Sequence, residues 1–146
     1  MTTKATKYVC KNEAKGIDAY TTAISGSAQI KVTKCGMFID KNRPWMHATP
    51  DFLSSCACYG EVKCLYGLKD GDFKSYVQKK SSCLEMIDGI KQLKRNHPYY
   101  YQTHQQLLIT GQQHCDVIVC ASLDTGLIFF NRENYARSRP LGGCCT

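Results

Sequence analysis

The sequence predicts a single α/β domain in which a central mixed β-sheet is flanked by helices. Its 146 residues are enough to bury one sizeable core but few for two. Segments with helical periodicity alternate with short runs typical of strands, and no internal repeat, low-complexity tract or Pro/Gly-rich linker divides the chain. These observations favour one domain over a repeat or two-domain architecture.

The chain is basic, with 19 Lys and Arg against 12 Asp and Glu and a formal net charge of +7. A positive balance favours anionic partners such as nucleic acid without identifying one. A soluble basic surface is an equally good explanation of the charge taken alone.

The N-terminal stretch MTTKATKYVCKNEAKG has no apolar core of a signal peptide. No run reaches the roughly 18 apolar residues of a membrane span. We therefore expect a soluble, intracellular protein without membrane association, in either nucleus or cytoplasm. Most of the ten cysteines should then be reduced, with several filling core positions.

The first predicted helix covers residues 12–25. Glu13, Ile17, Tyr20 and Ile24 recur at steps of four, three and four, which is one helical face. A carboxylate that heads an apolar stripe is costly in a dry core, so we expect Glu13 to have a metal or a cation as partner. The alternative is a glutamate at the rim of the stripe that reaches solvent.

Extended structure is predicted for residues 30–40 around Gly36, and a turn for the following KNRPW. FLSSC and YGEVKCL then form a predicted antiparallel hairpin, in which pairing Asp51 with Glu61 centres the turn on residue 56. Strand alternation sends Glu61 and Lys63 to one face of the hairpin. The pattern therefore brings Asp51, Glu61 and Lys63 together.

Val62 and Cys64 point to the opposite face of the same strand. On the polar face, two neighbouring carboxylates repel unless a cation lies between them, and oxygen ligands of this kind suit Mg²⁺. A lysine beside them supplies positive charge or orients an attacking water. This is the chemistry of metal-assisted phosphodiester hydrolysis, although surface salt bridging explains the bare pattern about as well.

The next segments predict a short helix that starts near Asp72 and a hairpin with a type I′ turn at Asp88-Gly89. HCDVIVCA and GLIFF, near the end of the chain, read as two apolar strands that complete the sheet.

Between these segments, residues 96–111 predict a helix with Asn96 or His97 as N-cap, Pro98 in its first turn and Gly111 at its end. Gln102 and Gln106 are four residues apart and face the same way. An ordinary amphipathic helix with Leu107 and Leu108 packed inward is the alternative interpretation.

In this order, the elements resemble the YqaJ-like viral recombinase domain, in the lambda-exonuclease-type branch of the PD-(D/E)XK nuclease superfamily. The resemblance runs from about Tyr8 to about Asn131. KNEAKGIDAY is similar to the family's N-E-x-x-A-x-x-x-Y helix, ATPD to A-S-P-D and GEVKC to the E-I-K-C strand. YYYQTHQQLLITGQQHCDVIV is similar to Y-Y-Q-x-Q-x-Q-L followed by a C-D strand. The resemblance implies a restriction-endonuclease-like core.

Carried over to this sequence, the resemblance makes Asp51 and Glu61 metal ligands and Val62 a ligand through its backbone carbonyl. It makes Lys63 the residue that orients the hydrolytic water. Glu13 matches an acidic residue that supports the site, and Gln102 matches a glutamine beside it. The implied cofactor is Mg²⁺, with Mn²⁺ as a substitute.

Three positions depart from the family pattern. Phe52 replaces the glycine that usually follows Pro-Asp, Val9 replaces a glycine before the first motif, and His104 replaces the second glutamine of Q-x-Q. His104 and Gln106 are the candidate substrate contacts, and imidazole at 104 changes that contact because it is shorter and can titrate. We interpret residues 1–146 as one YqaJ-like nuclease domain; truncation at both ends and a degenerate mobile-element copy stay open.

The predicted function is a Mg²⁺-dependent deoxyribonuclease, exonucleolytic on duplex ends in recombination or DNA end processing. DNA is the expected partner, and the resemblance adds a single-strand annealing protein and a homo-oligomer. One alternative is a DNA-binding remnant without turnover. The other is a zinc-stabilised interaction module built on Cys56, Cys58 and Cys64, to which Cys35, Cys115 and Cys120 could contribute only by folding.

Overall fold

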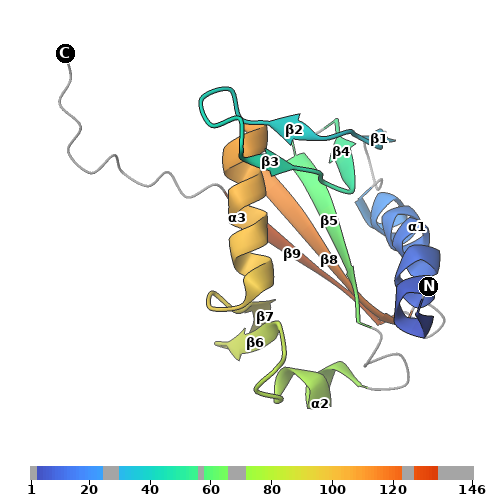
Figure 1. The fold of residues 1–146 in the computed structure, drawn as a ribbon. Helices are drawn as coiled ribbons and strands as arrows, with labels where there is room; N and C mark the ends of the chain where they lie inside the picture. Colours follow the sequence, from blue (N-terminus) through green and yellow to red (C-terminus); the bar gives the residue numbers. More distant parts are fainter. Residues whose placement is uncertain (1–2, 25–29, 56–57, 66–71, 123–126, 135–146) are drawn as a thin grey trace.

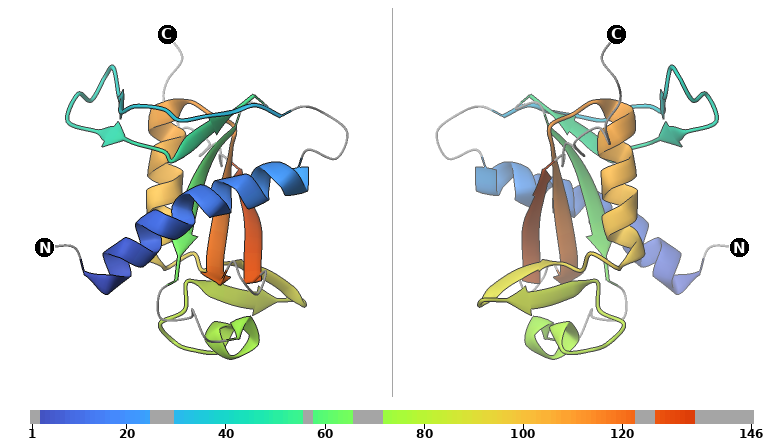
Figure 2. Two further views of the ribbon diagram at one scale, coloured as in Figure 1. Left: turned by 90° about the vertical axis from the view of Figure 1, so that its right-hand side faces the viewer. Right: turned by 90° about the vertical axis from the view of Figure 1, so that its left-hand side faces the viewer.

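A five-stranded mixed sheet forms the centre of the protein, in the strand order β1-β4-β5-β8-β9. Our computed structural model describes residues 3–24, 30–55, 58–65, 72–122 and 127–134. Helix α1 crosses one face of the sheet and α3 lies on the other (Figures 1 and 2). The predicted central mixed sheet flanked by helices is therefore confirmed.

Two small hairpins, β2–β3 and β6–β7, accompany the central sheet. The helices and strands, in chain order, are α1 Lys4–Ile24, β1 Val32–Thr33, β2 Phe38–Ile39, β3 His47–Ala48, β4 Phe52–Ser54, β5 Cys58–Cys64, α2 Phe73–Val77, β6 Leu84–Ile87, β7 Ile90–Leu93, α3 Pro98–Thr110, β8 His114–Ser122 and β9 Leu127–Asn134.

The hairpin of β4 and β5 has the predicted register. Its antiparallel pairs, Phe52↔Gly60, Leu53↔Tyr59 and Ser54↔Cys58, are all centred on residue 56. The turn itself, at residues 56–57, lies outside the described residues. On its other edge β5 runs parallel to β8, and β8 pairs antiparallel with β9. The sheet is mixed because the β5–β8 connection returns the chain in the same direction.

Strand β5 contributes to two separate cores because its alternate side chains point to opposite faces. Tyr59 packs beneath α3 with Leu107 and with the inward residues of β8. Val62 packs on the α1 side with Tyr20, among others. The predicted separation of Val62 from the polar residues of β5 is confirmed.

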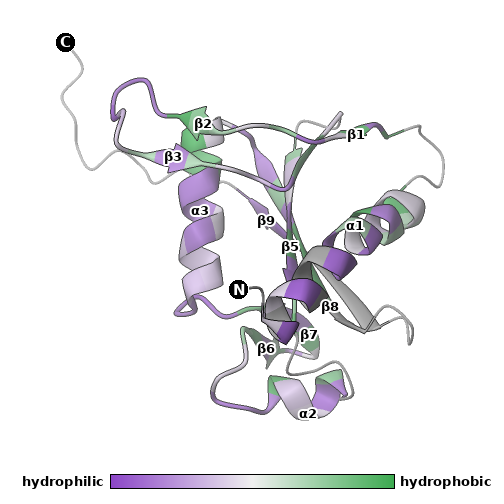
Figure 3. Cartoon of the chain, turned by 45° about the vertical axis from the view of Figure 1, so that its right-hand side comes forward, coloured by the Kyte–Doolittle hydropathy of each residue, from purple (hydrophilic) through white to green (hydrophobic). Residues whose placement is uncertain are grey.

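Helix α1 begins at Lys4 rather than at Asn12 and is longer than predicted. Its inward stripe is as expected for Tyr20, which is 1% exposed, and for Ile17 and Ile24, which pack against the same core. Hydrophilic and hydrophobic bands alternate along the helix (Figure 3). Gly16 allows the close approach, since a Cβ there would lie 3.0 Å from Val62 Cγ1.

A buried carboxylate ties α1 to the sheet. The Tyr20 hydroxyl donates a hydrogen bond to Asp116 of β8, and Arg132 of β9 donates two, from Nε at 2.6 Å and Nη2 at 2.8 Å. Burial by itself would raise the pKa of Asp116, but the hydrogen bonds from Arg132 and Tyr20 outweigh it and lower the pKa. The charge of Asp116 is thus compensated, and its hydrogen bonds join α1, β8 and β9.

The predicted caps and turns are also confirmed. Asp72 accepts hydrogen bonds from the first amides of α2, and His97 Nδ1 accepts one from the Tyr99 amide at the start of α3. Gly111 ends α3 with φ of 68°, and Asp88 and Gly89 have φ of 51° and 76°, as a type I′ turn requires.

Within the described part of the chain, no helix combines the length and apolar character needed to cross a membrane. Several of its cysteines are buried, Cys58, Cys83, Cys115 and Cys120 among them, as expected for core-filling residues.

The Phe52–Gly60 pair generates the first prediction. A Cβ at Gly60 would lie 1.9 Å from Phe52 Cζ, so Gly60→Ala should lower the free energy of unfolding by about 1–3 kcal/mol through overpacking. In a Phe52→Leu background the same change should cost less, because the ring that it meets is gone. Denaturant unfolding of the four proteins measures this coupling.

Gly36→Ala is the matched control, since a Cβ at this exposed position meets nothing within 4 Å. Equal costs for Gly60→Ala with and without Phe52 would contradict the steric explanation.

Candidate active site

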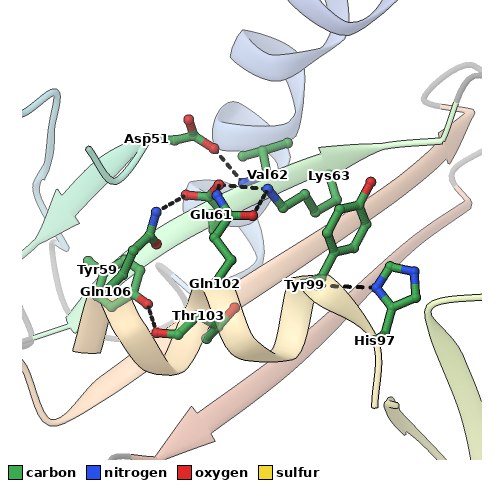
Figure 4. A network of polar contacts seen from close by, with 10 residues as sticks. All are labelled: Asp51, Tyr59, Glu61, Val62, Lys63, His97, Tyr99, Gln102, Thr103 and Gln106. Carbon is green, nitrogen blue, oxygen red and sulfur yellow. Dashed lines mark hydrogen bonds and ion pairs between the residues drawn. The ribbon is translucent and has the colours of Figure 1, made fainter. Parts of the chain in front are cut away.

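Four polar side chains from β5 and α3 meet on the α3 side of the sheet (Figure 4). Glu61 lies at the centre and is only 5% exposed. Its Oε1 accepts hydrogen bonds from Lys63 Nζ at 2.7 Å and from Gln102 Nε2 at 3.0 Å. Its Oε2 lies 3.4 Å from Gln106 Nε2. Both oxygens of a buried carboxylate are thus engaged by donors.

Lys63 is held on three sides. Besides Glu61, its Nζ donates to Gln102 Oε1 at 2.9 Å and lies 4.8 Å from the centroid of the Tyr99 ring. The ring face attracts the ammonium group electrostatically. Sequence reasoning missed Tyr99, although its position three residues before Gln102 on the same helical face could have indicated it.

Helix α3 holds this face against β5 through one firm contact in the core. The buried Tyr59 hydroxyl donates to the Thr103 carbonyl oxygen at 2.6 Å. Tyr59 is two residues before Glu61 on the same face of β5, and Thr103 follows Gln102. The register of helix on strand therefore determines which glutamines reach the carboxylate.

Asp51 lies at the edge of β5, just beyond the last β4–β5 pair. Its Oδ2 accepts a hydrogen bond of 2.6 Å from the Val62 amide, which has no β4 residue opposite it. The N–H and C=O of one strand residue point to the same side of the strand, so the Val62 carbonyl emerges on the edge occupied by Asp51. Two carboxylates and this carbonyl thus approach one another.

The charges of the two carboxylates are poorly compensated. Burial raises the pKa of Glu61, Asp51 raises it further, and Lys63 offsets only part of the increase. Burial likewise raises the pKa of Asp51, against the opposing effects of the Val62 hydrogen bond, Lys63 and Lys34. A cation placed between two such carboxylates would favour their charged forms.

Two carboxylates and a backbone carbonyl are the oxygen donors that a hard divalent cation such as Mg²⁺ takes. Among the described residues, no three His, Cys, Asp or Glu side chains are grouped closely enough to hold a metal. Mg²⁺ commonly uses one or two carboxylates and keeps several waters. Asp51, Glu61 and the Val62 carbonyl would suffice for such a site.

Glu13 does not join this cluster by hydrogen bonding. It is half-buried on α1, and within the described residues it has no hydrogen-bond or ion-pair partner. Its charge nevertheless acts on Cys64, on the α1 face of β5. A hydrogen bond with Cys120 lowers the pKa of Cys64, and the charges of Glu13 and Asp51 oppose this by raising it. Its supporting role stays a prediction.

The two candidate substrate contacts have different surroundings. His104 Nε2 lies 3.3 Å from Glu133 of β9, and its ring stacks near Tyr100, so it points away from Glu61. Gln106 is buried and directed at Glu61. Gln106 is thus held toward the carboxylate, and its role as a substrate contact stays a prediction.

The cysteines of the zinc interpretation are separated. Cys58 and Cys64 stand at opposite ends of β5, which at the usual rise per strand residue places them about 20 Å apart. Cys56 lies outside the described residues. One zinc ion cannot use both Cys58 and Cys64, so a zinc site made from these three cysteines is wrong.

The raised pKa of Glu61 generates a prediction for the metal-free protein. A carboxyl group whose pKa is higher in the folded state, here above its ordinary 4.5, stabilises the fold fully at low pH. That contribution is lost as the pH rises through the folded-state pKa. Glu61→Gln should therefore weaken the pH dependence of stability and leave the protein at least as stable as the parent at pH 7 in EDTA.

Thermal midpoints between pH 4 and pH 8 measure this difference, with Glu85→Gln on β6 as the control. A large loss of stability in Glu61→Gln at pH 7 would show that the Lys63 ion pair outweighs burial.

No protein-family model matches the chain, and no curated protein matches it in sequence. The comparison of structures, in contrast, gives clear similarity to an alkaline exonuclease, LHK-Exo from Laribacter hongkongensis.

The crystal structure of LHK-Exo in complex with dAMP has a TM-score of 0.66 and 19% identity, covering 93% of this chain and 60% of that one. A second structure of LHK-Exo has a TM-score of 0.62 and 19% identity, covering 87% and 56%. The chain thus spans up to 60% of the length of these neighbours. The similarity shows that this chain has the same fold as the part of LHK-Exo that it covers.

Proposed function

We propose that the protein is a Mg²⁺-dependent deoxyribonuclease that hydrolyses phosphodiester bonds at duplex DNA ends, in recombination or DNA end processing. The observation that carries the proposal is the buried Glu61 beside Asp51, with Lys63 at 2.7 Å from Glu61. The fold shared with an alkaline exonuclease and the net charge of +7 support DNA as the substrate. An annealing protein and a homo-oligomer remain predictions of the resemblance.

Asp51, Glu61 and the Val62 carbonyl would hold the ion, which when bound polarises the phosphate and lowers the pKa of a water. These groups are held in place by the protein itself. Asp51 is fixed by the Val62 amide, and Glu61 by Gln102 and Gln106. Fixed ligands reduce the reorganisation needed at the moment of reaction.

Lys63 supplies the positive charge and the donor of the site. Its ammonium group lies 2.7 Å from Glu61 and offsets part of the cost of burying that carboxylate. Gln102 and Tyr99 can keep Nζ at the site while it donates a hydrogen bond to an attacking water or to a phosphate oxygen. Lys63 therefore orients the nucleophile, and Gln102 positions both Lys63 and Glu61.

The direct test uses end-labelled linear duplex and closed circular duplex, each with Mg²⁺ and with EDTA. Metal-dependent loss of the linear substrate alone supports an exonuclease. Loss of both substrates would indicate an endonuclease. Salt-sensitive binding without any cleavage would instead identify a DNA-binding remnant.

Replacements at Glu61 and Lys63 should fail in different ways. Glu61→Gln removes a ligand charge, so the rise in thermal midpoint that Mg²⁺ gives the parent should be lost together with cleavage. Lys63→Ala should keep that rise and bind DNA, yet lose on the order of 10² or more in turnover.

Lys15→Ala, which removes an equal charge from the exposed side of α1, is the control. Parental turnover in both site variants would refute a nuclease centre on β5.

Glu13→Ala tests whether α1 contributes to the same centre. If its charge supports metal binding, the variant should need more Mg²⁺ for half-maximal turnover while its thermal midpoint in EDTA stays unchanged. Asp18→Ala, an exposed carboxylate on the same helix, is the control. An unaltered Mg²⁺ requirement would make Glu13 a residue of the solvent-facing rim.

A further inference from the structure

The loop between β2 and β3 presents a tryptophan to solvent. Trp45 is 76% exposed, more than any other large hydrophobic side chain in the described residues. It is also the sole tryptophan of the sequence. A ring of this size gains from burial, so such exposure on an ordered loop suggests a contact surface.

The loop that carries Trp45 is well ordered. Asp40 Oδ1 accepts hydrogen bonds from the amides of Asn42 at 2.8 Å and Arg43 at 3.0 Å. The Asp40 amide donates to the Met46 carbonyl at 3.0 Å, and the Met46 amide to the Arg43 carbonyl at 2.8 Å. The backbone on both sides of the tryptophan is therefore fixed before any ligand binds.

The hairpin adjoins the candidate active site. Strands β2 and β3 contact α3, and the hairpin projects beside that helix (Figures 1 and 2). A pocket of about 260 Å³ lies between them, lined by His47, Ala48 and Thr49 of the hairpin side and by Gln102, Gln105 and Gln106 of α3. Gln102 in turn contacts Glu61 and Lys63. A DNA strand that reached Glu61 along this pocket would pass beside the β2–β3 hairpin.

The charges near the hairpin favour a nucleic acid over an apolar protein partner. Lys41 lies in the same loop and is exposed, and Lys34, also exposed, is close enough to Asp51 to lower its pKa, after the larger effects of burial and the Val62 hydrogen bond. Exposed aromatic rings that stack on bases, together with cations that neutralise the phosphates, are the usual means of binding single strands. Bases inside a duplex are already stacked, so the ring is suited to an unpaired base.

We propose that Trp45 stacks on an unpaired nucleobase of the DNA strand whose backbone lies at Glu61 and Lys63. The proposal rests on the proposed function, because it takes DNA as the substrate. It adds a contact that holds a frayed or single-stranded end. Trp45 is a binding residue here and takes no part in bond cleavage.

Tryptophan fluorescence reads this contact directly, because Trp45 is the sole tryptophan. The protein is titrated in EDTA at low salt with an oligothymidylate and with an abasic deoxyribose-phosphate strand of equal length. We expect quenching by the oligothymidylate and little or none by the abasic strand. Equal quenching by both strands would show a phosphate contact without stacking, and no quenching by either would leave the surface to a protein partner; both results overturn the proposal.

Anisotropy with a labelled oligothymidylate tests the energetic weight of the ring. Trp45→Ala should weaken binding by about 10-fold or more, as expected for the loss of one stacked base. Trp45→Phe should stay within a few-fold of the parent. Ile90→Ala, 67% exposed at the tip of the other hairpin, is the control. Parental affinity in Trp45→Ala, with an unchanged circular dichroism spectrum, overturns the proposal.

These measurements separate this proposal from the nuclease proposal, because binding in EDTA does not depend on hydrolysis. Base-dependent quenching without cleavage in Mg²⁺ would refute the nuclease and keep the stacking contact. Cleavage without quenching would keep the nuclease proposal and refute the stacking contact.

Discussion

The hydrogen bond between the Asp51 carboxylate and the Val62 amide is the interaction on which the site depends. Strand β4 stops pairing with β5 at Gly60, so the backbone of Val62 is left without a strand partner on that edge. Asp51 takes the place of the missing strand through its side chain. A carboxylate is thereby fixed at the point where β5 delivers Glu61 and Lys63 to the α3 face. An extra pair of ladder residues would close this edge and remove the opening.

On strand β5, the residues that stabilise the fold and the residues of the candidate active site lie on opposite faces. On its α1 face, Val62 lies in an apolar core, and the buried Tyr20 and Asp116 form a satisfied network nearby with the partly exposed Arg132. On its α3 face, Glu61 is buried with its pKa raised, at a cost to the metal-free fold. The well-compensated network supports the strand on which the poorly compensated charge lies. Unfavourable ionisable groups of this kind are concentrated where proteins carry out chemistry.

Much of this arrangement follows from short-range rules. The hairpin centre at residue 56, the alternation along β5, and the caps at Asp72, His97 and Gly111 were all predictable from spacing and residue type. The contacts between elements distant in sequence were not. Tyr99 on Lys63 and Glu133 on His104 depend on how α3 lies across the sheet. The periodicity of the sequence does not predict the orientation of α3 relative to the sheet. The early start of α1 was missed because the prediction was based on the stripe that begins at Glu13, and it left out residues 4–11.

The packing of Phe52 over Gly60 has a consequence for how such sequences diverge. This chain has a large ring after Pro-Asp, and the space for it comes from the residue across the hairpin. The two positions are coupled, because a side chain at 60 meets the ring at 52 and is accommodated at a lower cost once that ring is replaced by a smaller residue. Neighbouring lineages would then differ at both sites together. An alignment that scores each column independently would count this single exchange as two unrelated differences, so similarity would be underestimated in the stretch next to Asp51 and Glu61.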